Sequence, residues 1–324
     1  MRALVIGSHG FIGSRVVDQL AKQGVQVYGV DSLSVYKPKN IKQYYLNLLY
    51  KNENLVDKLS GFKRINLTDS QQVNELLNEF KPTHIINCAG ISVADVCAEN
   101  INEAVSSIYL LNSAILQAIK KDVNIERYVY LSSSMIYGDF GNNFPDENFL
   151  PNPKDPYGAI KLGGESLIRS FNAQWQLPFT IIRPSAVYGP LDSNLRVTGI
   201  FMEKAANGQT LVVADQNESL DFTYVEDTVK GVMSVLNNSS SLNETFNISR
   251  GESRTILDLA KLITKYYPKS KIQIGGNVEF MPGLERPKRG SLNINKAREL
   301  LNYEPAFDLE AGIEEYVKFW NKTY

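Results

Sequence analysis

Short apolar runs alternate with amphipathic segments through the first half of this chain, and this alternation restricts the possible folds more than any other feature. The apolar runs are rich in β-branched side chains. They cover residues 3–7, 25–31, 62–66, 84–89, 127–132 and 179–183. Helical periodicity covers residues 11–24, 69–80, 100–121 and 157–174. Nearly continuous apolarity is typical of parallel strands covered on both faces. The pattern predicts an α/β chain with a Rossmann-type, doubly wound parallel sheet.

The character of the sequence changes after Pro184. Pro, Gly and Asn become frequent, and the helical patterns at residues 226–236 and 255–267 are less regular. No linker rich in Gly, Ser or Pro separates the two parts. We expect a first domain over residues 1–183 and a smaller C-terminal region over residues 184–324, of which some segments return to the first domain.

A glycine-rich turn joins the first predicted strand to the first predicted helix. It reads Gly7-Ser8-His9-Gly10-Phe11-Ile12-Gly13, with the spacing G-x-x-G-x-x-G. The first glycine allows a tight turn, the second lets the backbone approach a pyrophosphate, and the third lets the helix pack on the strand. The alternative is a plain glycine-rich turn. The position between strand and helix favours a dinucleotide site, with these candidate residues: Gly7, Gly10, Phe11, Ile12 and Gly13.

Asp31 closes the second predicted strand. A carboxylate there accepts hydrogen bonds from an adenosine ribose and repels a 2′-phosphate. We therefore predict NAD rather than NADP as cofactor, although Lys37 and Lys39 nearby weaken this preference. The alternative is that Asp31 only caps the segment that follows.

Three further residues are candidates for contact with the cofactor. Leu67 and Asp69 follow the third predicted strand, where Asp69 would contact the adenine amine or else only cap the next helix. Ala89 ends the fourth strand among small residues, which would let a cofactor ribose lie close to the backbone.

Hydroxyl, phenol and ammonium groups follow the fifth predicted strand. Ser132, Ser133 and Ser134 lie at its carboxyl end, where ligands bind in such sheets. Tyr157 and Lys161 are four residues apart, so they share one face of a helical turn. A nearby cation favours the phenolate, so this pair can move a proton near neutral pH. Taken alone, the serines are equally a turn that satisfies its own backbone, and the Tyr/Lys spacing is that of many surface pairs.

Taken together, these features resemble the extended short-chain dehydrogenase/reductases, and within them the NAD-dependent nucleotide-sugar epimerase/dehydratase family. The glycines, the acidic strand end, the serines, the Tyr/Lys pair and the run at residues 183–190 occur in the expected order. The resemblance implies a catalytic hydroxyl at Ser133 and a general base at Tyr157. It implies that Lys161 is the electrostatic partner of this base and also holds the nicotinamide ribose. It also implies that Pro184 contacts the cofactor.

The same resemblance assigns roles to the two parts of the chain. Residues 1–183 become the NAD-binding domain with the catalytic residues, and residues 184–324 become mostly a substrate-binding region. The implied substrate is a nucleotide-diphosphate sugar, most closely a UDP-sugar. Its candidate contacts are Ser134, Ser185, Arg196 and Arg289. A homodimer is implied, in which the helices at residues 100–121 and 157–174 pair with their copies, although these helices would equally serve to cover the sheet.

The residues after the catalytic hydroxyl bear on the reaction. Dehydratases of this branch carry an Asp-Glu pair there, and decarboxylases tend to keep the Glu, whereas this chain has Ser134 and Met135. The resemblance is therefore closest to UDP-glucose and UDP-glucuronate 4-epimerases. These enzymes oxidise C4 to a transient ketone and return the hydride to its other face. A keto-reductase or dehydrogenase of a nucleotide sugar is the second hypothesis, and a non-catalytic NAD-sensing protein is the third.

The substrate contacts depart from the family pattern. Uronic-acid 4-epimerases place an Arg for the sugar carboxylate shortly after the motif at residues 187–190. Ser193 stands in that register, with Arg196 three residues later, and Arg196 is alternatively a surface residue. Apolar residues replace polar ones of the family at three positions: Ile108, Ala186 and Leu220. The diphosphate then needs other donors, for which Arg289 is the first choice, before Arg286 and Lys288.

Charge and composition exclude several other classes of protein. The formal net charge of −1 provides no basic field for nucleic acid or an anionic membrane. Two cysteines and two histidines argue against a disulfide framework and against a metal site. No apolar run approaches the roughly 20 residues of a membrane helix, and the N-terminal residues do not resemble a signal peptide. We expect a metal-free, cytoplasmic protein.

Overall fold

The computed structural model describes residues 1–34, 55, 57–120, 124–192, 196–276 and 287–323. Its centre is a seven-stranded sheet in which every neighbouring pair is parallel. The strands are β1 (Arg2–Ile6), β2 (Gln26–Asp31), β3 (Gly61–Arg64), β4 (His84–Asn87), β5 (Arg127–Leu131), β6 (Phe179–Pro184) and β11 (Glu244–Ile248). Their order is β11-β6-β5-β4-β1-β2-β3. The predicted doubly wound fold is confirmed, and its strand order reverses between β1 and β4, which is where such sheets bind ligands.

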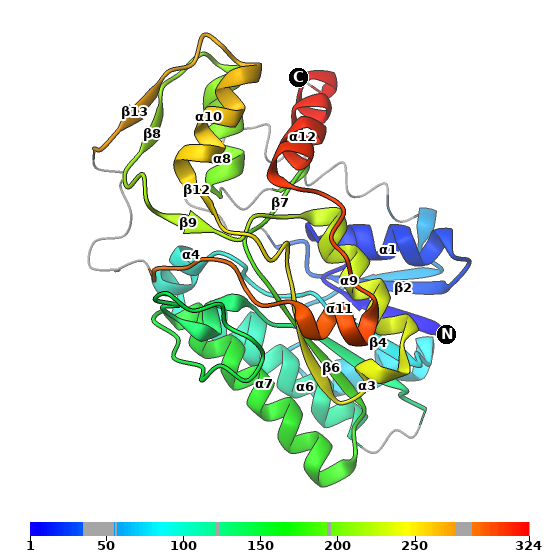
Figure 1. The fold of residues 1–324 in the computed structure, drawn as a ribbon. Helices are drawn as coiled ribbons and strands as arrows, with labels where there is room; N and C mark the ends of the chain where they lie inside the picture. Colours follow the sequence, from blue (N-terminus) through cyan, green and yellow to red (C-terminus); the bar gives the residue numbers. More distant parts are fainter. Residues whose placement is uncertain (35–54, 56, 121–123, 193–195, 277–286, 324) are drawn as a thin grey trace.

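Helices cover both faces of the sheet (Figure 1). One layer consists of α3 (Ser70–Phe80), α6 (Leu111–Ile119) and α7 (Pro156–Trp175). The other consists of α1 (Gly13–Lys22), α9 (Val225–Asn237) and α11 (Asn295–Leu301). Within β1, Leu4 and Ile6 belong to the core beneath the first layer, and Ala3 and Val5 to the core beneath the second. Because side chains alternate along a strand and both faces are buried, the whole run is apolar.

The C-terminal region forms a smaller lobe, at the top of Figure 1. It contains α8 (Val197–Ala206), β8 (Leu211–Val213), β9 (Ser219–Leu220), β12 (Arg254–Thr255), α10 (Ile256–Tyr266), β13 (Ile272–Ile274) and α12 (Leu309–Thr323). Its own core joins α8, α10 and α12 through Phe201, Leu259 and Ile313. The short strands β7 (Val187–Tyr188) and β10 (Thr223–Tyr224) form a separate parallel pair. Meanwhile α9, β11 and α11 lie after residue 184 in sequence and yet build the central sheet domain.

The helical run after β4 differs from expectation. One helix over residues 100–121 was predicted, but the structure has four successive segments before residue 120. They are α4 (Ala94–Glu99), α5 (Ile101–Ala104), the π-helix η2 (Val105–Leu110) and α6. A π-turn takes in one extra residue per turn, which an apolar periodicity does not reveal.

Two short 3₁₀-helices lie elsewhere in the described chain, and these are η3 (Ser134–Tyr137) and η4 (Ser239–Ser241). No helix within the described ranges is both long and apolar enough to cross a membrane.

Candidate active site

The glycine-rich turn packs tightly at the carboxyl end of β1. The Gly7 N–H donates to the Val30 carbonyl at 2.8 Å, and Gly7 has a φ of 77° that favours glycine. A Cβ on Gly13 would lie 2.0 Å from the Gly7 carbonyl oxygen. A side chain at Gly13 would therefore push α1 away from β1. The turn has the tight geometry that the sequence predicted, with the start of α1 directed at the space beyond β1.

A cavity of about 190 Å³ opens beside this turn. Its lining includes many of the predicted cofactor and substrate residues, which are Gly7, Gly10, Phe11, Ile12, Gly13, Asp31, Leu67, Ala89 and Arg196. Asp69 is not among the lining residues. It caps α3 by accepting the Gln71 N–H at 2.8 Å, which is the alternative role considered for it. Pro184 ends β6 and also lies outside the lining.

The Asp31 carboxylate is fixed from both sides. Its Oδ2 accepts the His9 N–H of the glycine-rich turn at 2.9 Å, and its Oδ1 accepts the Leu33 N–H at 2.8 Å. A carboxylate has about four lone-pair sites, so two stay available to donors in the cavity. The arrangement can hold two ribose hydroxyls while it keeps the turn in place.

Tyr157 and Ser133 meet where η3 and α7 begin. The Ser133 Oγ accepts the Met135 N–H at 3.2 Å, and this hydroxyl is close enough to Tyr157 to lower the pKa of its phenol. Tyr157 is 8% exposed, and burial raises the pKa of its phenol to about 12. The positive charge of Arg196 and the nearby Ser133 hydroxyl act in the opposite direction. The serine therefore caps its own turn and lies near the phenol.

Lys161 is buried beside the same ring. Its Nζ donates to the Leu131 carbonyl at 2.6 Å and lies 5.9 Å from the centre of the Tyr157 ring. Burial lowers the pKa of this ammonium to about 8. The predicted Tyr/Lys pair is thus together, but Arg196 is the cation with the larger effect on the pKa of the phenol. The ammonium is engaged by the carbonyl at the end of β5, which the spacing in sequence could not show.

Arg196 crosses from the C-terminal lobe to the sheet domain. It directly precedes α8, and its side chain is 30% exposed. Its Nη1 donates to the Val187 carbonyl at 2.7 Å, and its Nη2 donates to the Ser92 carbonyl at 3.3 Å. The guanidinium therefore forms part of the cavity wall next to the phenol, and it is not a freely solvated surface group.

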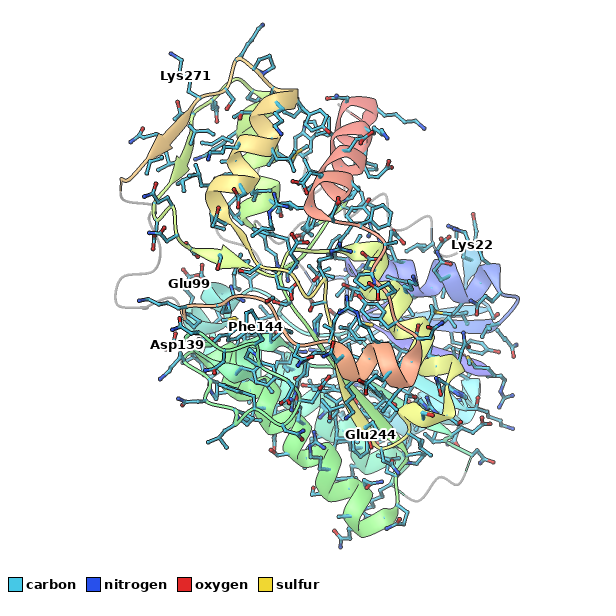
Figure 2. The ribbon with its side chains drawn as sticks, in the orientation of Figure 1. Lys22, Glu99, Asp139, Phe144, Glu244 and Lys271 are labelled. Atoms are coloured by element: carbon cyan, nitrogen blue, oxygen red, sulfur yellow. The ribbon has the colours of Figure 1, made fainter. Side chains whose placement is uncertain are left out.

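The other predicted substrate contacts lie around the start of η3. The Ser134 and Ser185 hydroxyls are hydrogen-bonded at 3.2 Å, and both are buried. The Arg289 Nη1 contacts the Met135 Sδ at 3.0 Å. Lys288 is exposed, and its N–H donates to Asp139, which Figure 2 labels on the loop before α7. Several positions considered in the sequence lie outside the described residues, and these are Lys37, Lys39, Ser193 and Arg286.

A buried ion pair next to the site was missed in the sequence. Glu165 Oε1 and Oε2 accept from Arg183 Nε at 2.9 Å and Nη2 at 2.6 Å. Glu165 follows Lys161 by four residues, as Lys161 follows Tyr157, so the three share one face of α7. That repeated spacing was the signal available in the sequence. The pair ties α7, the helix that carries Tyr157 and Lys161, to β6.

No cluster of three or more His, Cys, Asp or Glu side chains suited to a metal ion occurs in the part of the chain that the structure describes. The two cysteines are not paired with each other. Burial raises the pKa of the Cys88 and Cys97 thiols to about 12, so both are poor nucleophiles and metal ligands at neutral pH.

Comparison with known proteins agrees with this geometry. The sequence model of the NAD dependent epimerase/dehydratase family matches residues 3–249. A putative UDP-glucose 4-epimerase of Methanocaldococcus jannaschii is 30% identical over 333 residues, which cover 99% of this chain and 98% of the relative. A UDP-glucuronate 4-epimerase of Thermodesulfobacterium geofontis is 28% identical, with coverage of 98% and 95%. The crystal structure of UDP-glucuronic acid 4-epimerase from Bacillus cereus, in complex with UDP-glucuronic acid and NAD, is 25% identical with a TM-score of 0.89 over the whole of both chains.

Proposed function

Because the chain belongs to the NAD-dependent epimerase/dehydratase family, we propose that it is an NAD-dependent 4-epimerase of a nucleotide-diphosphate sugar, with a UDP-sugar as substrate. Membership of the family confirms the resemblance seen in the motifs and the choice of NAD. One observation carries the proposed reaction. The buried Tyr157 phenol has Ser133 close enough to lower its pKa, and the next two side chains, Ser134 and Met135, carry no carboxylate.

The residues around the cavity fit a dinucleotide. Backbone can approach closely only at a turn without side chains, and a Cβ on Gly7 would lie 2.9 Å from the Ala89 nitrogen. Asp31 keeps lone pairs for ribose hydroxyls, and the start of α1 offers N–H groups to phosphate. NAD bound there supplies the hydride acceptor of the reaction.

Tyr157 moves the proton. Its Oη is the group that can take a proton from a sugar hydroxyl, with the Ser133 hydroxyl close by. Burial opposes ionisation of the phenol, and the positive charge of Arg196 favours it. Lys161 holds its ammonium next to the ring and the Leu131 carbonyl, where it can also hold a ribose hydroxyl of the cofactor.

The side chains that follow Ser133 favour epimerisation over loss of water. Elimination needs an acid and a base beside the sugar ring. Ser134 is hydrogen-bonded to Ser185, and the thioether of Met135 contacts the guanidinium of Arg289. None of these groups replaces a carboxylate at neutral pH. Proton transfer is thus restricted to the hydroxyl that faces Tyr157.

Arg196 favours an acidic sugar as the finer substrate choice. It belongs to the cavity wall and is close enough to Tyr157 to lower the pKa of the phenol. A cation beside the atom that reacts at C4 is near the substituent on C5, which in glucuronate is a carboxylate. Charge-assisted bonds from a guanidinium to a carboxylate are strong. We therefore propose UDP-glucuronate as the preferred substrate and UDP-glucose as the second choice. We also propose that Arg289 binds the diphosphate.

The test is incubation of the purified protein with UDP-glucuronate, UDP-glucose and a deoxythymidine-diphosphate sugar, without added cofactor, followed by NMR. The expected product is the C4 epimer of UDP-glucuronate. Tyr157→Phe should retain NAD and lose at least about 100-fold in turnover, as expected for loss of a general base. Tyr267→Phe is the matched control, because the Tyr267 hydroxyl donates to Asn321 within the C-terminal lobe, and neither residue lines the cavity. Turnover that requires added NADH would instead indicate a keto-reductase, and full turnover by Tyr157→Phe would remove the catalytic assignment.

We further propose that two copies pair through the helices beside α7. Ile101 on α5 is 51% exposed and Leu110 on η2 is 47% exposed. Large apolar side chains left on a helical surface favour association. Sedimentation at micromolar concentration should give a dimer, and Leu110→Glu should shift it towards the monomer. A monomer in the wild-type protein would contradict this pairing.

A further inference from the structure

The positive charge of Lys161 is buried without a carboxylate of its own. The residue is 5% exposed, and its Nζ donates to the Leu131 carbonyl at 2.6 Å. Glu165 lies one turn further along α7, but both of its carboxylate oxygens accept hydrogen bonds from Arg183, at 2.9 and 2.6 Å. A buried ammonium is costly unless its surroundings compensate for the lost water. Another group must therefore contribute to the stability of this charge.

Three other titratable groups around the ammonium carry no charge at neutral pH. Cys88 and Cys97 are close enough to influence its pKa, and the centre of the Tyr157 ring lies 5.9 Å from Nζ. Burial raises the pKa of both thiols and of the Tyr157 phenol to about 12. These groups are therefore neutral at pH 7 and offer no anion to Lys161.

An aromatic ring faces the ammonium from the neighbouring strand. The Lys161 Nζ lies over the ring of Tyr130, 5.0 Å from its centre. Tyr130 directly precedes Leu131 on β5 and is 1% exposed. The face of an aromatic ring carries partial negative charge, and a cation within about 6 Å of its centre is attracted to it, most strongly where water is excluded. Two consecutive residues of β5 thus hold the ammonium, one by its carbonyl and the other by its ring.

A glycine on α7 lets the ring take this position. A Cβ on Gly164 would lie 2.5 Å from the Tyr130 hydroxyl oxygen and 2.9 Å from the ring carbon that bears it. The hydroxyl is buried and has no hydrogen-bond partner among the residues that the structure describes. A phenylalanine at this position would therefore lose no hydrogen bond. The part of Tyr130 that acts on Lys161 is the ring.

We propose that Tyr130 is a positioning residue of the active site, whose ring face stabilises the Lys161 ammonium and holds it beside the Tyr157 phenol. A carboxylate in the same place would compete with a phenolate for the positive charge, whereas a neutral ring does not. The field of the ammonium is then directed at the group that reacts. The inference rests on the proposed function for the use of this charge in the reaction, but the contact between ring and ammonium does not depend on which sugar reacts.

The pKa of Lys161 in the purified protein tests the contact. It is followed by NMR after labelling the lysine Cε with carbon-13, and Lys161→Met identifies the signal. Tyr130→Phe, the matched control, keeps the ring and should leave this pKa unchanged. A ring-trifluorinated phenylalanine in place of Tyr130 keeps the shape but withdraws electrons from the ring face. The pKa of Lys161 should then fall by about 0.4–1.5 pH units, which corresponds to one contact of this kind. A purely structural role of the ring would not produce this difference.

Turnover of UDP-glucuronate connects the contact to the reaction. In the trifluorinated variant, the limb of the pH–rate profile that follows Lys161 should move to lower pH by the same amount as the pKa, and it should stay in place in Tyr130→Phe. An unchanged Lys161 pKa in the trifluorinated variant would overturn the inference, and so would a limb that does not move with the pKa. If the wild type converts no nucleotide sugar while the fluorinated ring still lowers the pKa, the proposed function fails and the contact stands.

Discussion

The buried ion pair between Glu165 and Arg183 makes a quantitative prediction. The side chains are 1% and 4% exposed, and the two contacts are 2.9 and 2.6 Å long. Replacing Glu165 with Met, which has a similar volume, removes the anion and leaves the guanidinium buried. An uncompensated buried charge of this kind costs about 3–5 kcal/mol. Arg183 keeps its bonds to the Tyr137 hydroxyl at 2.8 Å and the Glu147 carbonyl at 3.0 Å, so we expect the lower end, about 3 kcal/mol.

The double variant Glu165→Met/Arg183→Met separates this cause from general damage to the core. Buried ion pairs replaced by apolar residues of similar volume are often neutral in stability. We therefore expect the double variant to lie within about 2 kcal/mol of the wild type and to be more stable than Glu165→Met alone. A single domain of ordinary stability has about 5–15 kcal/mol, so the single variant should lose a large share of it.

Urea unfolding at pH 7, followed by far-UV circular dichroism, measures these differences. Glu304→Met is the control, because Glu304 pairs with Arg298 at 3.0 Å but both side chains are largely exposed, and such pairs contribute about 0–1 kcal/mol. The reasoning is refuted if Glu165→Met costs no more than this control. It is also refuted if the double variant is destabilised by the sum of the two single variants.

Three further predictions concern the site. Asp31→Ala removes the acceptor of the His9 N–H and the proposed acceptor of the cofactor ribose. Calorimetry should therefore show about 10- to 150-fold weaker NAD binding, which follows from the roughly 1.5–3 kcal/mol of a charged hydrogen bond. Unchanged affinity would show that the carboxylate does not contact the cofactor. Arg196→Met removes the cation that lowers the pKa of Tyr157, so the pH–rate profile should shift to higher pH, and Arg196→Lys should partly restore it. A profile that stays in place would exclude this electrostatic role. Burial lowers the pKa of Lys161 from 10.5 to about 8, so the folded protein holds a costly buried ammonium below pH 8, and this cost is relieved as the pH rises towards 10.5. Between pH 7 and pH 10.5, the unfolding free energy of the wild type should therefore rise by about 3 kcal/mol relative to that of Lys161→Met, as measured by urea titrations. If the difference in unfolding free energy between the two proteins does not change with pH, the lowered pKa is contradicted.

Much of the site was predictable because its motifs are local. The glycines of the first turn, the acidic end of β2 and the i, i+4 spacing of Tyr157 and Lys161 each depend on the geometry of a few consecutive residues. The structure places Gly7, Gly13, Asp31 and Ala89 around one cavity, and it brings the Tyr157 phenol to Ser133. Asp69 differs, because a carboxylate before a helix fits a capping role and an adenine contact equally well in sequence, and only its bond to the Gln71 N–H shows the cap.

The sequence by itself determined the class of fold and the chemistry, because strand burial, turn sterics and helical spacing are imposed by neighbouring residues. Tertiary structure alone decided which groups act on one another. It brought Arg196 close enough to influence the phenol, turned the Lys161 ammonium to the Leu131 carbonyl, and paired Glu165 with Arg183. It also placed β11 in the central sheet and directed Ser107 into the cavity through a π-turn. These contacts join residues from different elements of the chain, so their energies depend on packing that no local pattern encodes.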